Sequence, residues 1–197
     1  MQETPAEFDL LSMTKRLLSI VLLLFIAACT SAPQPRRVDA IVIKENDQHF
    51  QLTVPISKLD LLVPKQTFAR DNIFGNTGPH PRYFIFNDRS RSLTLSGWFE
   101  PAERYPGIQK LWESYAGTRV GEPLAPTDVR FTKVGAWDTV AYNLPLSATP
   151  NTHVKAELVQ AGTWIELHLS TGSGKTTGEQ FEQLADVLRS LQVREKP

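Results

Sequence analysis

Two glutamates, Glu157 and Glu166, are the residues of this sequence best suited to acid–base chemistry. They belong to two β-rich runs, His153–Gln160 and Thr163–Ser170, which an Ala-Gly dipeptide separates. A two-residue turn there predicts a hairpin in which Glu157 lies directly opposite Glu166. Opposed carboxylates repel each other, which raises the pKa of one of them toward the range used for proton transfer. Two other interpretations stay open: with Lys155 on the same face this is a solvated mixed-charge surface, or the register is shifted.

Other patterns with chemical meaning predict structure rather than catalysis. The segment Gly172–Thr176 reads GSGKT, but a phosphate-binding loop also needs a glycine where the chain has Leu169. We therefore expect a polar loop and no nucleotide. No residue has the surroundings of a local nucleophile motif, so no catalytic residue is assigned. We expect no metal and no cofactor, because metal-ligand spacing is absent among the histidines His49, His80, His153 and His168.

Aromatic and charged side chains on two strands define a candidate binding patch. Because side chains alternate along a strand, Trp98 and Trp164 lie opposite the aliphatic faces of their strands. If helices cover the aliphatic faces, both tryptophans point to solvent or to a partner, as interface aromatics do. The alternative is that the loops Asp71–Pro81 or Gly117–Asp128 cover this face and make both tryptophans core residues. The candidate patch comprises Trp98, Glu100, Trp164, Glu166 and His168.

Hydrophobic periodicity predicts the elements that position these residues. Alternating apolar residues predict strand pairs at Val38–Ile43 with Phe50–Val54, Arg82–Asn87 with Ser92–Phe99, Val129–Val134 with Thr139–Leu144, and His153–Gln160 with Thr163–Ser170. Two apolar stripes with helical spacing are Ile108, Leu111, Trp112 and Tyr115, and Phe181, Leu184, Ala185, Leu188 and Leu191. A capping box of Thr176 with Glu179, or of Thr177 with Gln180, begins the second helix. The predicted class is α+β: an antiparallel sheet of hairpins with two amphipathic helices packed on one face.

The composition fits one globular domain and excludes several classes of protein. Of 197 residues, 41% are hydrophobic and 21% are charged, which excludes a disordered chain and a multi-span membrane protein. Lys and Arg number 21, as do Asp and Glu. The resulting net charge of zero predicts no nucleic-acid partner. A single cysteine excludes an intrachain disulfide.

The N-terminal sequence has the features of a secretion signal. Lys15-Arg16 precedes the uncharged run Leu17–Ala28, which is too short to span a hydrocarbon core but suits the apolar region of a signal peptide. Small residues at the end of the run and Cys29 after it resemble the lipobox of bacterial lipoproteins. The resemblance implies cleavage between Ala28 and Cys29, a thioether-linked diacylglycerol on Cys29, and acylation of the new N-terminus. The acyl chains then make the membrane a partner of this protein.

This signal sets the expected domain organisation and location. Acidic residues before Lys15 oppose the orienting charge bias of a signal, so translation is expected to start at Met13. We expect a signal peptide at 1–28, a lipidated N-terminus and linker at 29–37, and a single α+β domain at 38–197. Thr30 directly follows Cys29, at the position where an Asp would resemble a signal for retention at the inner membrane. With Thr at this position, we expect the protein in the outer membrane, facing the periplasm.

The chain end resembles the fold of the PsbP extrinsic proteins of photosystem II. The shared features are the strand run Trp164–Leu169, a following loop, and a helix with Phe181, Leu188 and Leu191. The likeness covers about the last forty residues, and it implies a fold without implying any chemistry.

Two functions from different classes follow from these observations. A lipid-anchored accessory of the cell envelope needs an anchor, a compact domain and a binding patch, and its partner would be an envelope protein or polymer. The alternative is a small envelope hydrolase that uses Glu157 and Glu166 or a histidine site assembled by the fold.

Overall fold

The computed structural model describes residues 40–68, 82–117, 125–145, 151–172 and 176–196. All of them belong to one unit of the chain, Arg37–Pro197. The predicted signal peptide, Cys29, the linker, and most of the loops Asp71–Pro81 and Gly117–Asp128 lie outside these residues. Among the helices that the structure describes, none has the length and apolar character needed to cross a membrane.

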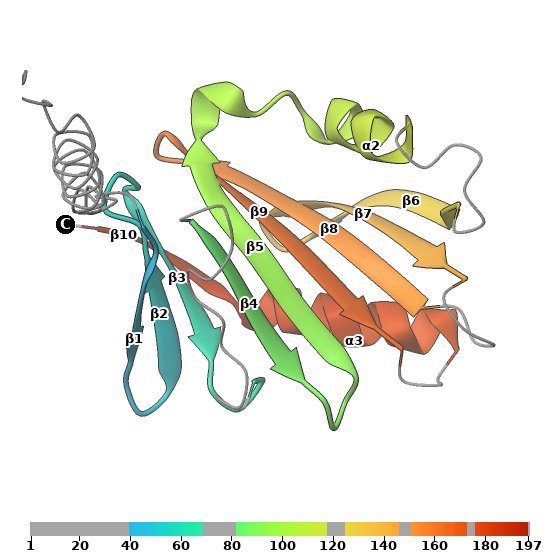
Figure 1. The fold of residues 1–197 in the computed structure, drawn as a ribbon, viewed down its shortest axis with the longest axis horizontal. Coiled ribbons are helices and arrows are strands. Elements are labelled where there is room, and N and C mark those ends of the chain that lie inside the picture. The colour runs from blue at the N-terminus through green and yellow to red at the C-terminus, as the bar shows by residue number, and fades with distance from the viewer. Residues whose placement is uncertain (1–39, 69–81, 118–124, 146–150, 173–175, 197) are drawn as a thin grey trace, which may run out of the picture. The chain divides into compact units, whose positions relative to one another are not determined.

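The larger of two antiparallel sheets has six strands in the order β4-β5-β9-β8-β7-β6 (Figure 1). These strands are β4 Tyr83–Asp88, β5 Leu93–Pro101, β6 Thr127–Val134, β7 Trp137–Leu144, β8 Asn151–Gln160 and β9 Thr163–Thr171. The predicted hairpins β4–β5, β6–β7 and β8–β9 are confirmed. In the turn of the first hairpin, the Ser90 hydroxyl and the Arg91 side chain and backbone donate to Asp88, and these bonds lower the pKa of Asp88 to about 2.

A second sheet of four strands corrects the expectation of a single sheet. Its order is β1-β2-β3-β10, with β1 Val42–Glu45, β2 His49–Thr53, β3 Leu59–Pro64 and β10 Gln192–Glu195. The sequence pattern missed β3 because every residue of that strand is buried, which removes the alternation that marks a half-buried strand. It missed β10 because four residues are too few to show a period. The α+β class itself is confirmed.

The two helices, α2 Ile108–Gly117 and α3 Thr177–Ser190, pack on opposite faces of the larger sheet. Leu184 and Leu188 of α3 join the aliphatic core that includes Leu167 of β9. Trp112 and Tyr115 of α2 contact the Tyr142 ring on the other face, at centroid distances of 4.9 and 5.5 Å. The expected packing of both helices on one face is therefore corrected. The physical reason is that α3 and the smaller sheet together fill the aliphatic face, which leaves α2 to the aromatic one.

Gly97 shows how closely β5 and β9 approach each other in the middle of the larger sheet. A Cβ at this position would collide with the backbone oxygen of Glu166 and would lie 2.9 Å from Leu167 Cδ2. Only glycine fits without a shift of backbone. The close approach brings the strand that carries Trp98 directly against the strand that carries Glu166.

The capping box of α3 gives a testable prediction about local stability. Thr176 Oγ1 accepts from the Glu179 backbone N–H at 3.3 Å, and Glu179 Oε2 accepts from the Thr176 N–H at 3.0 Å. Thr176→Ala should therefore lower the free energy of unfolding by about 1 kcal/mol, measured by urea titration. Thr177→Ala is the matched control, because Gln180 binds the Thr152 backbone instead of capping the helix. Equal losses in the two variants would contradict this assignment.

Candidate functional site

A cluster of polar and aromatic side chains lies on the face of the larger sheet that α2 covers. Strand alternation on β7, β8 and β9 places all of its members on this face. We call it the polar cluster, and it comprises Tyr142, His153, Lys155, Glu157, Trp164, Glu166 and His168. Three aromatic residues from the segment of η2 (Ala102–Arg104) and α2 contact it: Tyr105, Trp112 and Tyr115.

The predicted opposition of Glu157 and Glu166 is confirmed. The two residues are register partners of the β8–β9 hairpin, whose turn residues Ala161 and Gly162 have positive φ values of 47° and 73°. This combination is that of a type I′ turn, which fixes the register. The solvated interpretation is wrong, since Glu157 is only 2% exposed and Glu166 only 4%. The physical reason is the cover that Tyr105 and α2 provide.

Each buried carboxyl has its own partner. Lys155 Nζ donates to Glu166 Oε1 at 2.7 Å, and the same Nζ lies 5.2 Å from the centre of the Tyr115 ring. Trp164 Nε1 donates to Glu157 Oε2 at 2.6 Å. One carboxyl group, that of Glu166, therefore forms an ion pair, while that of Glu157 accepts from a neutral donor.

Burial and the neighbouring charge of Glu166 together raise the pKa of Glu157 to about 9, although the Trp164 bond and Lys155 act in the opposite direction. Glu157 is thus a neutral carboxylic acid at pH 7. Burial also raises the pKa of Tyr105, and the charge of Glu157 adds to this effect. In many active sites, a protonated carboxyl group acts as the acid while a neighbouring ionised carboxylate has the other role.

The raised pKa of Glu157 predicts a specific dependence of stability on pH. Because the folded-state pKa exceeds the ordinary value of 4.5, the folded protein holds an extra proton between pH 4.5 and about 9. The contribution of Glu157 to the free energy of unfolding is fully present below pH 4.5. It falls as the pH rises above this value, by up to about 1.4 kcal/mol per pH unit. Glu157→Gln keeps an acceptor for Trp164 but cannot ionise, so its unfolding free energy should fall less between pH 5 and pH 9.

Urea unfolding at several pH values measures this difference. Glu113→Gln is a control for the loss of a carboxyl, because Glu113 is exposed on α2. Parallel pH profiles for wild type and Glu157→Gln would show that Glu157 is not the responsible group.

Two histidines form the other half of the polar cluster. His153 Nδ1 and His168 Nε2 are 3.1 Å apart, while the ring centroids are 5.3 Å apart with planes inclined by 10°. The rings therefore meet edge to edge, and one nitrogen donates to the other. His168 Nε2 also lies 3.4 Å from the Tyr142 hydroxyl, which donates to the Tyr115 hydroxyl. This chain of bonds connects the sheet to α2.

The structure places the five predicted patch residues next to one another but not all at the surface. Trp98 faces Glu166 across β5 and β9, and Glu100 faces Trp164. Of the two alternatives for the tryptophans, burial holds for Trp164, which is 6% exposed, and Trp98 is half-buried. The cover over Trp164 includes the Tyr105 ring, at a centroid distance of 5.4 Å.

Glu100 is buried as well, and His168 is half-buried. Glu100 Oε2 accepts from Arg82 and Arg104, at 3.2 and 2.9 Å. Sequence reasoning placed Lys155 correctly but missed His153, Tyr142 and Tyr115. The hairpin register could have identified His153, because it lies two residues before Lys155 on the same strand face. No local signal connects Tyr142 or Tyr115 to this site.

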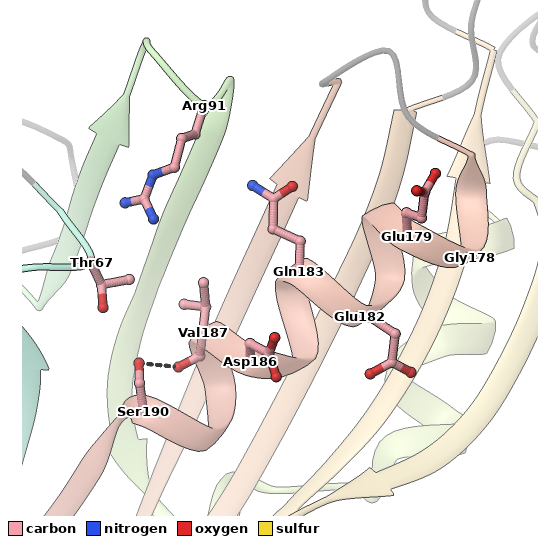
Figure 2. A pocket seen from close by; sticks show the side chains of 9 residues that line it. All are labelled: Thr67, Arg91, Gly178, Glu179, Glu182, Gln183, Asp186, Val187 and Ser190. Carbon is pink, nitrogen blue, oxygen red and sulfur yellow. Dashed lines mark hydrogen bonds between the residues drawn. The ribbon is translucent and has the colours of Figure 1, made fainter.

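A groove of about 610 Å³ lies on the other side of the molecule, along α3. Figure 2 shows the Arg91 guanidinium over the side of the helix that carries Gln183. The groove is lined by Thr67, Arg91, Gly178, Glu179, Glu182, Gln183, Asp186, Val187 and Ser190. Gln183 Oε1 is buried and accepts no hydrogen bond from the described residues. The volume is within the range of small-molecule sites. Its lining comes from three distant segments, which no sequence pattern connects.

Neither site has the donor set of a metal centre. Within residues 40–68, 82–117, 125–145, 151–172 and 176–196, no three side chains of His, Cys, Asp or Glu are grouped to hold a metal ion.

Comparison with known proteins shows no family for this chain. No protein-family model and no curated protein sequence matches the chain. A protein of Bacteroides thetaiotaomicron VPI-5482 is similar at 14% identity and a TM-score of 0.41, over 71% of this chain and 46% of that protein. The chain thus spans less than half of that protein's length.

A second similar structure is cyanobacterial PsbP (CyanoP) of Synechocystis sp. PCC 6803. Its identity is 11% and its TM-score 0.43, over 84% of this chain and 99% of that one. It agrees with the faint PsbP-like similarity expected from the chain end. At these TM-scores neither likeness bears on activity.

Proposed function

We propose that this protein is a lipid-anchored accessory of the cell envelope, held in the outer membrane by acyl chains on Cys29 and facing the periplasm. The support for the anchor is the sequence Lys15-Arg16, the apolar run Leu17–Ala28, and Cys29 directly after it. Two or more acyl chains anchor stably where a single chain does not. The described domain then acts as a binding or assembly module for an envelope protein or polymer.

One observation favours binding over catalysis: the titratable side chains of the polar cluster are buried or half-buried, and they bond to members of the same cluster. Glu166 bonds to Lys155, Glu157 to Trp164, and His168 to its neighbours. Hydrogen-bonded networks of this kind make a fold more rigid. The groove along α3, with the buried acceptor of Gln183, is the better candidate for contact with a partner.

Cell fractionation of a Cys29→Ala variant tests the anchor. Without the thiol the acylation step has no acceptor, so the variant should accumulate as the uncleaved precursor or leave the membrane fraction. Ser31→Ala is the matched control and should fractionate as wild type does. A Cys29→Ala chain that is processed and stays in the outer membrane would refute the proposal.

The rival function, a small envelope hydrolase, is favoured by the raised pKa of Glu157 beside Glu166. Complementation of a deletion strain separates the two functions. An accessory should work equally well with Glu157→Gln, because the amide still accepts from Trp164. A hydrolase that uses Glu157 as its acid should lose function with this variant while remaining folded.

A further inference from the structure

Three exposed apolar side chains gather at one end of the domain. Of the five large hydrophobic residues that the described part of the chain leaves exposed, Ile56 is the most exposed at 54%, and Val42 and Val159, at 44% each, lie at the same end of the domain. Val42 is paired with Thr53, three residues before Ile56. The Ser57 hydroxyl lies 3.1 Å from that of Thr163, which joins the β2–β3 turn to the β8–β9 turn. Figure 1 shows these two turns at the same end of the molecule.

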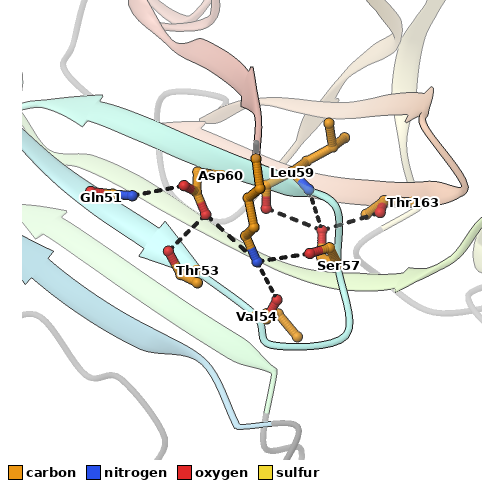
Figure 3. Close-up of polar contacts among 8 residues, drawn as sticks. Gln51, Thr53, Val54, Ser57, Leu59, Asp60 and Thr163 are labelled. Atoms are coloured by element: carbon orange, nitrogen blue, oxygen red, sulfur yellow. Dashed lines mark hydrogen bonds and ion pairs between the residues drawn. The ribbon is translucent and has the colours of Figure 1, made fainter.

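The turn that carries Ile56 is held by hydrogen bonds from distant parts of the chain (Figure 3). Lys196 Nζ donates to the backbone oxygens of Val54 and Ser57, both at 2.7 Å. The Ser57 hydroxyl accepts from the Leu59 N–H at 2.9 Å. Ile56 is therefore presented to solvent on a fixed turn, and it needs no rearrangement to bind an apolar surface.

The same end of the domain receives the chain from the proposed anchor. The described residues begin at Ala40, two residues before β1, and only residues 30–39 separate Ala40 from Cys29. A linker of this length spans about 18 Å as a flexible coil and at most about 35 Å when extended. The inference below thus rests on the proposed function. If Cys29 is lipidated, the end that carries Ile56 stays within this distance of the lipid.

Basic side chains accompany the apolar ones at this end. Lys58 and Arg194 are exposed beside the turn. Two carboxylates there are already bound: Asp60 accepts from Gln51 and Thr53 and faces Lys196, and Glu195 accepts from Gln160. Glu103 of η2, next to the β8–β9 turn, is an exposed carboxylate at the same end. Exposed cations beside an apolar tip match the chemistry of an anionic lipid surface.

We propose that this end, comprising Val42, Ile56, Lys58, Val159 and Arg194, docks on the surface of an anionic phospholipid bilayer. Ile56 enters the boundary between headgroups and acyl chains, and the two cations contact lipid phosphates. The contact orients the domain on the membrane, which the acyl anchor alone leaves free to rotate.

Fluorescence quenching on the full-length lipidated protein tests this contact. Because Cys29 is the only cysteine and carries a thioether, Ile56→Cys introduces a single reactive thiol for an environment-sensitive dye. Phe131→Cys is the matched control, an exposed apolar position on β6. The protein is placed in vesicles of phosphatidylethanolamine and phosphatidylglycerol (3:1) that carry a quencher on the acyl chains.

The dye at position 56 should be quenched about threefold more than the dye at position 131, and this difference should shrink on neutral phosphatidylcholine vesicles. Equal quenching at the two positions would overturn the proposal. An undiminished difference on neutral vesicles would overturn the part assigned to anionic lipid. Labelling of Cys29, or failure of both proteins to float with vesicles, would overturn the anchor itself and is recognised before any quenching is measured.

Discussion

Replacing Trp164 with alanine is expected to remove about 3–5 kcal/mol from the free energy of unfolding, as large aromatic deletions from protein cores do. Trp164 is buried beneath the Tyr105 ring. Its loss also removes the donor to Glu157 Oε2, which leaves a buried carboxyl without its bond. Because a domain is stable by about 5–15 kcal/mol, the variant should be largely unfolded at moderate urea concentrations.

Trp98→Ala is the matched control for this experiment. Trp98 has the same side chain on the neighbouring strand and faces Glu166, but it is only half-buried. Its truncation should cost clearly less, and both variants are compared by urea denaturation at pH 7. Similar, small losses of stability for both variants would mean that Trp164 is accessible to solvent. The hypothesis that both tryptophans belong to an exposed binding patch would then be supported.

Lys155→Met is expected to destabilise the domain by about 3–5 kcal/mol at neutral pH, because it leaves a buried charge without its partner. Glu166 would lose the ammonium at 2.7 Å and would still face Glu157 across the hairpin. The second variant, Lys155→Met with Glu166→Leu, replaces the whole pair with apolar side chains. It should recover most of the loss, since buried pairs rarely contribute more than well-packed hydrophobic residues.

A double-mutant cycle measures this coupling. The account predicts an interaction of several kcal/mol between Lys155 and Glu166, far above the 0–1 kcal/mol of a surface pair. Additive effects of the two single substitutions would show that the pair is solvated in the native protein.

Local sequence signals predicted the parts of this fold that are close in sequence. The register of Glu157 and Glu166 followed from a two-residue turn, because such a turn allows little freedom in the pairing of its strands. The pairing of β5 with β9 and of β3 with β10 could not be predicted in this way. Those contacts join strands far apart in the chain, and they depend on packing rather than on turn chemistry.

The candidate site illustrates the same limit. Strand alternation showed which side chains share a face of the sheet, and the structure agrees for Trp164, Glu166 and His168. Alternation carries no information about what covers that face. The apolar stripe with Trp112 and Tyr115 correctly predicted a helix. Its position over Tyr142 could not be predicted, because it depends on α3 and the smaller sheet covering the opposite, aliphatic face.

The most direct test of the central claim, attachment to the envelope through a lipid, is mass spectrometry of the N-terminal peptide of the membrane-extracted protein. We expect a first residue Cys29 that carries a diacylglyceryl thioether and an acylated amine, with residues 1–28 absent. A chain that still contains Leu17–Ala28, or one that begins at another residue with a free Cys29 thiol, would contradict it.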